Sequence, residues 1–169
     1  MLLICLLAFL GSVLTFFSGF GLGTILLPAF ALVFPLDISI ALTGIVHLSN
    51  NLFKYFLVKK DADYKIIFRF GIPAIIAAWV GAWIMGSVSK MPELLSYYIG
   101  VNEYKIEPFK VIVGALIIFF TSLDYLPQTK TISFSARFLP IGGFLSGFFG
   151  GISGHQGALR SMFLLRSGM

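Results

Sequence analysis

Several side chains that could bind a ligand or carry a proton lie inside an otherwise apolar stretch, residues 38–58. At about 100° per residue on an α-helix, these side chains share an arc of roughly 100°. We call them the polar stripe: Thr43, His47, Asn50, Asn51 and Lys54. Polar groups in hydrocarbon are costly unless they face partners or a cavity. The stripe therefore predicts a helix face turned toward the protein interior or toward water.

The charged side chains that fall within the apolar stretches are basic. They include His47, Lys54, His155 and Arg160, whereas no Asp or Glu lies within a predicted span. A carboxylate relay for protons or sodium therefore lacks its carboxylates, and the pattern favours a pathway for a small anion. A structural alternative stays open, in which the asparagines join helices by hydrogen bonds and Lys54 extends to the membrane surface.

Two glycine-rich segments, 18–23 and 146–154, resemble one another. Paired breaks at matching positions of two repeats are typical of secondary transporters, because unwound backbone survives in a bilayer only beside a cavity. Helices restarting at Thr24 and Gly157 would add N–H donors for an anion. The expected hinge and backbone-binding residues are Ser18, Gly19, Gly21, Gly23, Gly150, Gly151, Gly154 and Gly157. Side chains expected to complete the substrate path are Ser153, His155, Gln156 and Arg160.

The composition predicts a membrane protein, with the lipid bilayer as its surroundings. The 169 residues are 58% hydrophobic and 11% charged, and the mean hydropathy is +0.97. A net charge of +5 is typical of cytoplasmic loops, so we expect no nucleic-acid partner. The single cysteine, Cys5, excludes a disulfide within the chain. Motifs for metal, redox or nucleotide chemistry are missing from the sequence, so we expect no cofactor and no metal.

Apolar spans separated by polar linkers predict an all-α, polytopic membrane fold. Residues 38–58 and 66–88 each reach the about 20 residues that cross a bilayer core. A shorter span is expected at 109–123. The polar stretch 89–109 is expected to be an extramembrane loop or a short interfacial helix.

The glycine breaks divide the remaining helices. Residues 1–17 and 24–34 are expected to flank the first break, and a half-helix at 156–165 to follow the second. The repetition predicts a complete first repeat at 1–128 and the start of a second at 129–169.

Basic residues predict the orientation. The 54–69 region holds the densest cluster of Lys and Arg, and such loops stay on the cytosolic side. We therefore expect this loop in the cytosol of a multi-pass protein, most simply one of the bacterial inner membrane.

Three segments resemble the TauE/SafE family of membrane permeases. They are residues 18–28, 37–54 and 142–163, of which the last is the most specific. The resemblance implies a helical permease built from two repeats and linked to export or uptake of sulfite and organosulfonates. Because the second repeat is short here, we expect either a missing C-terminal half or a partner, such as a second copy in a homo-oligomer.

Other functions stay open at this point. Residues 151–154 match the Gly-x-Ser-Gly of rhomboid intramembrane proteases, but a rhomboid takes its base from a later helix and only His155 follows Ser153. We therefore expect no catalytic residue. A non-transporting membrane subunit or an inactive fragment is the other alternative. The favoured hypothesis is a permease that moves a small anion, sulfite or an organosulfonate, by alternating access.

Overall fold

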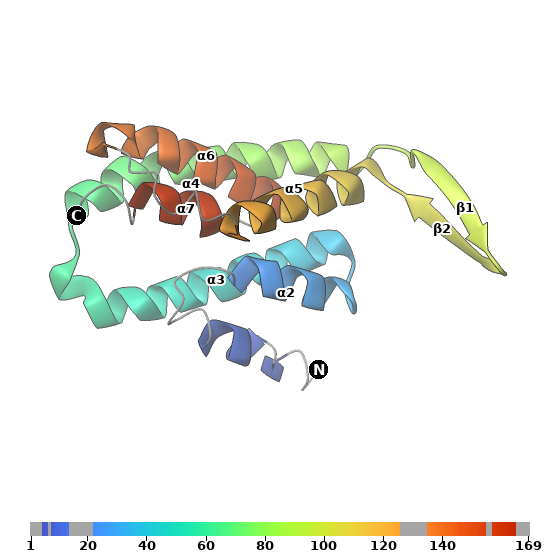
Figure 1. Cartoon of the computed structure of the whole chain (residues 1–169), viewed down its shortest axis with the longest axis horizontal. Helices are drawn as coiled ribbons and strands as arrows, with labels where there is room; N and C mark the ends of the chain where they lie inside the picture. The colour runs from blue at the N-terminus through green and yellow to red at the C-terminus, as the bar shows by residue number, and fades with distance from the viewer. Residues whose placement is uncertain (1–4, 7, 14–21, 126–134, 155–156, 165–169) are drawn as a thin grey trace.

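The structure, a computed structural model, describes residues 5–6, 8–13, 22–125, 135–154 and 157–164 (Figure 1). These residues are predominantly helical, which confirms the all-α prediction, and one two-stranded sheet interrupts them. Helical residues 5–6 and 8–13 come first. The elements that follow are α2 (Leu22–Ala31), α3 (Leu36–Val58), η1 (Lys59–Asp61), α4 (Tyr64–Val88), β1 (Leu95–Ile99), β2 (Asn102–Ile106), α5 (Pro108–Tyr125), η3 (Ala136–Phe138), α6 (Leu139–Ser153) and α7 (Gly157–Leu164).

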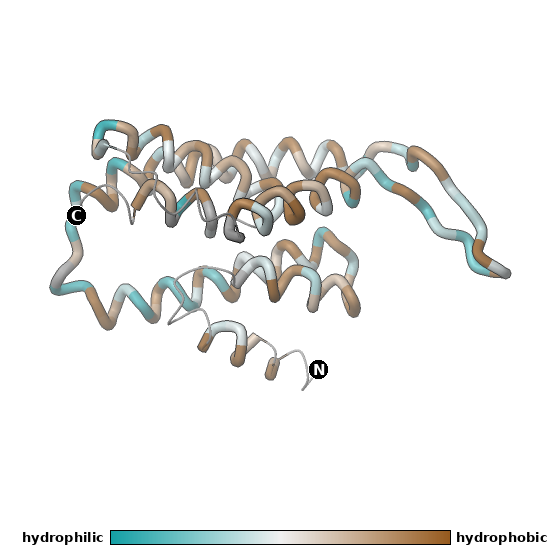
Figure 2. Tube along the Cα trace, in the orientation of Figure 1, coloured by the Kyte–Doolittle hydropathy of each residue, from teal (hydrophilic) through white to brown (hydrophobic). Residues whose placement is uncertain are grey.

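The helices lie where the hydrophobic pattern places them. α3, α4 and α5 cover the three predicted spans, and α7 covers most of the predicted half-helix. In the described ranges, α4 alone is long and apolar enough to cross a membrane by length and composition, while α5 is apolar but shorter. Figure 2 shows hydrophilic residues recurring along α3.

The start of α4 is fixed by its N-terminal cap. The carboxylate oxygen Oδ1 of Asp63 accepts hydrogen bonds from the backbone N–H groups of Lys65, at 2.8 Å, and Ile66, at 3.3 Å. A capping carboxylate satisfies amides that a helix leaves unpaired in its first turn. Across the short turn from η1 into this cap, the chain reverses, so that α3 and α4 run in opposite directions (Figure 1).

The stretch 89–109 differs from the helical option that we expected for it. It forms an antiparallel hairpin in which Tyr97 lies opposite Tyr104 and Ile99 opposite Asn102. Gly100 occupies the two-residue turn at a φ of +64°, a conformation that suits glycine. An alternation of apolar and polar residues in β1 and β2, rather than helical periodicity, accounts for the strands.

Glycines bring the backbones of α4 and α6 into direct contact. Residues Gly143, Gly147 and Gly151 recur at every fourth position of α6 and so share one face. A Cβ atom added to each would overlap a backbone carbonyl oxygen of α4, those of Phe70, Ala74 and Ala78 respectively. The same kind of contact occurs from α4, where Gly81 lies against the Phe148 carbonyl of α6. Small residues of this kind are what allow helices to approach closely in a membrane.

An apolar cluster joins α2 to this helix pair. Leu27 of α2 packs with Met85 of α4, Phe109 and Val113 of α5, and Ile152 of α6. All five side chains are buried. α2, the helix that follows the first glycine-rich segment in the sequence, is thereby held against the α4–α6 pair.

Replacing a contact glycine tests this arrangement. Gly147→Ala forces a methyl group into the Ala74 backbone and is expected to lower the free energy of unfolding by about 1–3 kcal/mol, the cost of overpacking. The measurement is chemical unfolding of the detergent-solubilised chain.

Gly71→Ala is the matched control, because a Cβ at Gly71 meets no atom within 4 Å. It should leave stability unchanged or raise it slightly, since alanine favours helix. Equal effects of the two variants would contradict the close contact.

Candidate functional site

α6 and α7 are separate helices, but most of the predicted break at 146–154 is helical. α6 continues through Ser153 and ends at Gly154, which has a φ of +68° and donates its N–H to the Gly150 carbonyl at 2.8 Å. α7 begins at Gly157. Gly150 and Gly151 therefore lie inside a helix instead of in unwound backbone. Gly151 is glycine because α6 touches Ala78 there.

The buried Thr43 of α3 lies beside this break, with its methyl group toward Gly154. Thr43 is fully buried, and its Oγ1 donates to the Ser39 carbonyl at 2.7 Å. A Cβ atom placed on Gly154 would lie 3.8 Å from Thr43 Cγ2 and 3.7 Å from Ile40 Cγ2. One end of the polar stripe thus lies directly against the α6 terminus.

The cationic part of the stripe lies toward α7. Lys54 and Arg160 are both partly buried and lie within range of one another's positive charge. Between Thr43 and Lys54 on the same face, His47 is half-buried with its Nε2 atom enclosed, and Asn51 is half-buried. The charges of Lys54 and Arg160, from the segments assigned to the two repeats, are therefore close enough to act on one another.

Asn50 lies in different surroundings from the rest of the stripe. It lines a cavity of about 460 Å³ between α3 and the N-terminal helical residues, together with Ser12, Ser49 and apolar side chains such as Phe9 and Phe53. The arc predicted by helical spacing thus spans two surroundings, the break on one side and this apolar cavity on the other.

Other predicted residues fall at helix ends or outside the described ranges. Ser18, Gly19, Gly21, His155 and Gln156 lie outside those ranges. Gly23 is buried in the first turn of α2, whose start at Leu22 precedes the predicted Thr24. Gly157 is the first residue of α7, as predicted.

Ser153 is fully buried, and its Oγ donates to the Phe149 carbonyl one turn earlier, at 2.9 Å. In the described part of the chain, His, Cys, Asp and Glu side chains form no group of three or more that could hold a metal ion.

Sequence reasoning missed two fully buried serines, Ser39 and Ser146. Ser39 lies one turn before Thr43 on the same face and donates to the Pro35 carbonyl at 2.9 Å. Its spacing of four from Thr43 is the signal that extends the stripe.

A second cavity approaches the break from the end of α3. It has a volume of about 280 Å³ and is lined by Asp37 and Ile40 of α3, Ser89 after α4, Phe109 of α5 and Ile152 of α6, among others. Asp37 lies in the first turn of α3, just outside the predicted span. This cavity reaches Ile152, the residue before Ser153, and is called the vestibule below.

The left-handed Gly154 is a sensitive point of the site. Gly154→Ala is expected to lower the free energy of unfolding by about 1–2 kcal/mol, because an L-residue is strained at this φ although its Cβ has ordinary space. Gly154→Asn should cost less, because asparagine tolerates the left-handed region.

Unfolding of both variants measures the difference, with Gly114→Ala as a helical control whose Cβ meets nothing within 4 Å. A Gly154→Ala protein as stable as the Gly114→Ala control would show that the break adopts another conformation.

Comparison with known proteins gives one match. A family model described as "Sulfite exporter TauE/SafE" matches residues 4–169, nearly the whole chain. No curated protein and no solved structure matches it.

Proposed function

We propose that this chain, which belongs to the sulfite exporter TauE/SafE family, moves sulfite or an organosulfonate by alternating access. Members of that family are multi-pass membrane permeases, typically of the bacterial cell membrane, and are not enzymes. The chain is accordingly a membrane transport protein of the sulfite and organosulfonate type. The observation that supports transport by alternating access is that the polar stripe of α3 lies beside the break between α6 and α7.

The positive charge near the polar stripe and α7 favours binding of an anion. Lys54 and Arg160 lie within range of each other, and neither α6 nor α7 carries an acidic residue. Two cations held near one another inside a membrane protein repel, so an anion between them lowers the electrostatic energy. The guanidinium of Arg160 matches the paired oxygens of a sulfite or sulfonate group, since its N–H donors form a fork.

Backbone donors support the same substrate class. The first turn of α7 has N–H groups that the helix itself does not pair, and it carries the positive end of the helix dipole. Polar neutral groups of α3, Thr43 and Asn51, lie on the stripe face and supply further hydrogen-bonding capacity.

The break also supplies a joint for alternating access. Gly154 separates α6, which is locked onto α4, from α7, which carries Arg160. Rotation at the break would move the cation of α7 relative to the stripe on α3. The vestibule beside Asp37 would then provide the opening on the side opposite the η1 loop, which we assign to the cytosol.

Substitutions in the stripe test the proposal in proteoliposomes loaded with sulfite. Lys54→Gln is expected to raise the KM for sulfite roughly ten- to hundredfold, because charge-assisted hydrogen bonds contribute about 1.5–3 kcal/mol. Asn51→Leu should abolish flux in a protein that still folds, since it places an apolar side chain in the path.

Lys60→Gln in the exposed η1 turn is the matched control and should leave KM unchanged. Undiminished affinity in Lys54→Gln would assign Lys54 to the membrane surface. Normal flux by Asn51→Leu would remove the stripe from the path. Covalent labelling of Ser153 by a fluorophosphonate would instead indicate a serine hydrolase.

A further inference from the structure

The vestibule contains a single charged group, and that charge is negative. Among the described residues that line this cavity of about 280 Å³, Asp37 alone is ionisable and the others are neutral. The carboxylate belongs to the first turn of α3, at the opposite end of this helix from η1. An anion that enters through the vestibule therefore meets a charge of its own sign first.

The vestibule adjoins the polar stripe. Ile40 lines the vestibule, and a Cβ atom placed on Gly154 would lie 3.7 Å from its Cγ2 atom. The same Cβ atom would lie 3.8 Å from Cγ2 of Thr43, the first residue of the stripe. The wall of the vestibule and the start of the stripe thus meet at the end of α6.

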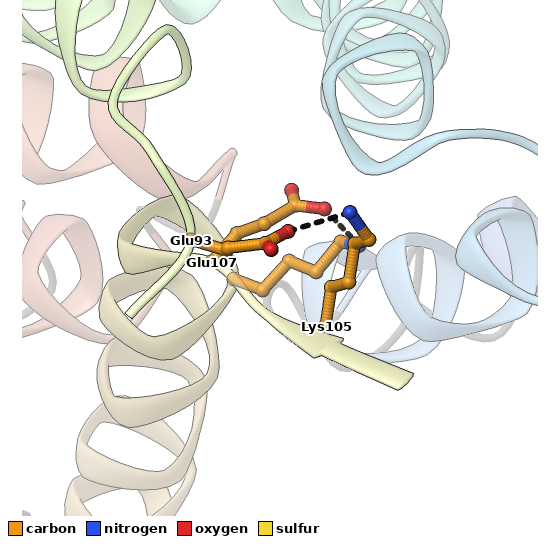
Figure 3. A network of polar contacts seen from close by, with 4 residues as sticks. Glu93, Lys105 and Glu107 are labelled. Carbon is orange, nitrogen blue, oxygen red and sulfur yellow. Dashed lines mark hydrogen bonds and ion pairs between the residues drawn. The ribbon is translucent and has the colours of Figure 1, made fainter. Parts of the chain in front are cut away.

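Lysines at this end of the molecule are held by glutamates. Lys110 lines a neighbouring cavity beside the start of α3, but its Nζ lies 2.8 Å from Glu107 Oε1. Lys105 Nζ lies 2.8 Å from Glu93 Oε2 (Figure 3). The hydrogen bond and the negative charge of Glu93 raise the pKa of Lys105, so this pair stays charged. The fields of two paired opposite charges largely cancel at a distance, which leaves the carboxylate of Asp37 to set the potential in the vestibule.

Other cations lie outside the vestibule. Lys90 follows Ser89 in the sequence and is exposed, but it is not among the described residues that line this cavity. Lys54 lies near the other end of α3, about 25 Å from Asp37 at 1.5 Å per residue. Salt screens charges that far apart, since the Debye length is about 8 Å in physiological salt. Lys54 and Arg160 therefore act on an anion after it has passed Asp37.

We propose that Asp37 selects singly charged anions, such as organosulfonates and hydrogen sulfite, over doubly charged ones, such as the sulfite dianion. This inference rests on the proposed function, because it concerns the same path. Repulsion by a fixed charge is proportional to the charge of the anion, so a dianion meets twice the barrier. The neutral, mostly apolar walls of the vestibule concentrate the field of the carboxylate along the cavity. Near neutral pH sulfite exists in both charge forms, so the selection applies to sulfite itself.

The dependence on charge gives a quantitative expectation. A negative potential lowers the local concentration of a monoanion by a Boltzmann factor, and that of a dianion by the square of this factor. For one carboxylate in contact with water we expect a factor of about two to five for a monoanion, and hence about four to 25 for a dianion. Asp37 is exposed, so the factor should fall as salt is added.

Charged thiol reagents measure the potential in the vestibule without using transport. In a Cys5→Ser background, Ser89→Cys is labelled by sulfonatoethyl methanethiosulfonate, which is negative, and by its positive trimethylammonium analogue. Asp37→Asn should raise the ratio of the first rate to the second about four- to 25-fold, because the two rates change in opposite directions. Asp37→Glu keeps the charge and should leave the ratio near that of the wild type.

Tyr98→Cys, 70% exposed on the hairpin, is the matched control, and Asp37→Asn should leave its labelling ratio unchanged. An unchanged ratio at Ser89→Cys, or an equal change at both positions, would overturn the proposal.

Uptake into proteoliposomes at zero membrane potential tests the selection itself. The probes are ethanesulfonate, a monoanion, and ethane-1,2-disulfonate, a dianion, both below saturation. In Asp37→Asn the initial rate for the dianion should rise by the square of the gain for ethanesulfonate, and high salt should remove both gains. A barrier at the mouth slows passage in both directions, so a mixed orientation of the protein does not hide the effect.

The outcomes separate this inference from the proposed function. Equal gains for the two anions, or no gain for the dianion, would overturn the role of Asp37 while leaving transport standing. A wild-type protein that moves neither ethanesulfonate nor sulfite would contradict the proposed function instead, and labelling at Ser89→Cys would still report the potential of the vestibule.

Discussion

The backbone contact between α4 and α6 is the constraint on which the rest of the structure depends. Gly143, Gly147 and Gly151 place the α6 backbone against the carbonyls of Phe70, Ala74 and Ala78. Such an approach is available only to glycine, because any Cβ would overlap those carbonyl groups. The contact spans two turns of α6 and ends just before the break. It therefore fixes where α6 stops and from where α7 departs.

The position of α7 in turn determines where the charge of Arg160 lies. α7 restarts three residues after Gly154, and the charge of its Arg160 acts on Lys54 of α3. Thr43 and Ile40 of α3 lie next to Gly154, at the end of α6. Phe163 of α7 forms a buried cluster with Phe70 of α4 and Leu139 of α6, so α7 is also packed against this pair. The cluster around Leu27 ties α2 to the same rigid pair.

Hydrophobic pattern and charge predict much of this arrangement, but glycine has two uses that a sequence cannot separate. α4 follows from its apolar length and the stripe from its helical spacing. The sequence predicts unwound backbone at Gly151, whereas this glycine packs against Ala78, a partner far away in the sequence that no local pattern reveals. Helical spacing places Asn50 on the stripe, yet Asn50 lines the cavity beside residues 8–13, since an arc of roughly 100° can border two neighbours. The alternation in Leu95–Ile99 was visible but lay within a polar linker.

The central claim is that the α3 stripe lines an anion path next to α7. The direct measurement is the labelling rate of Asn51→Cys, in a Cys5→Ser background, by a sulfonate-bearing methanethiosulfonate in proteoliposomes. The account predicts that excess ethanesulfonate slows this labelling several-fold and that Arg160→Gln removes the protection. At Leu48→Cys, 61% exposed on α3, ethanesulfonate should have no effect. An Asn51→Cys protein that is unreactive, or that reacts at the same rate with and without ethanesulfonate, would contradict the claim.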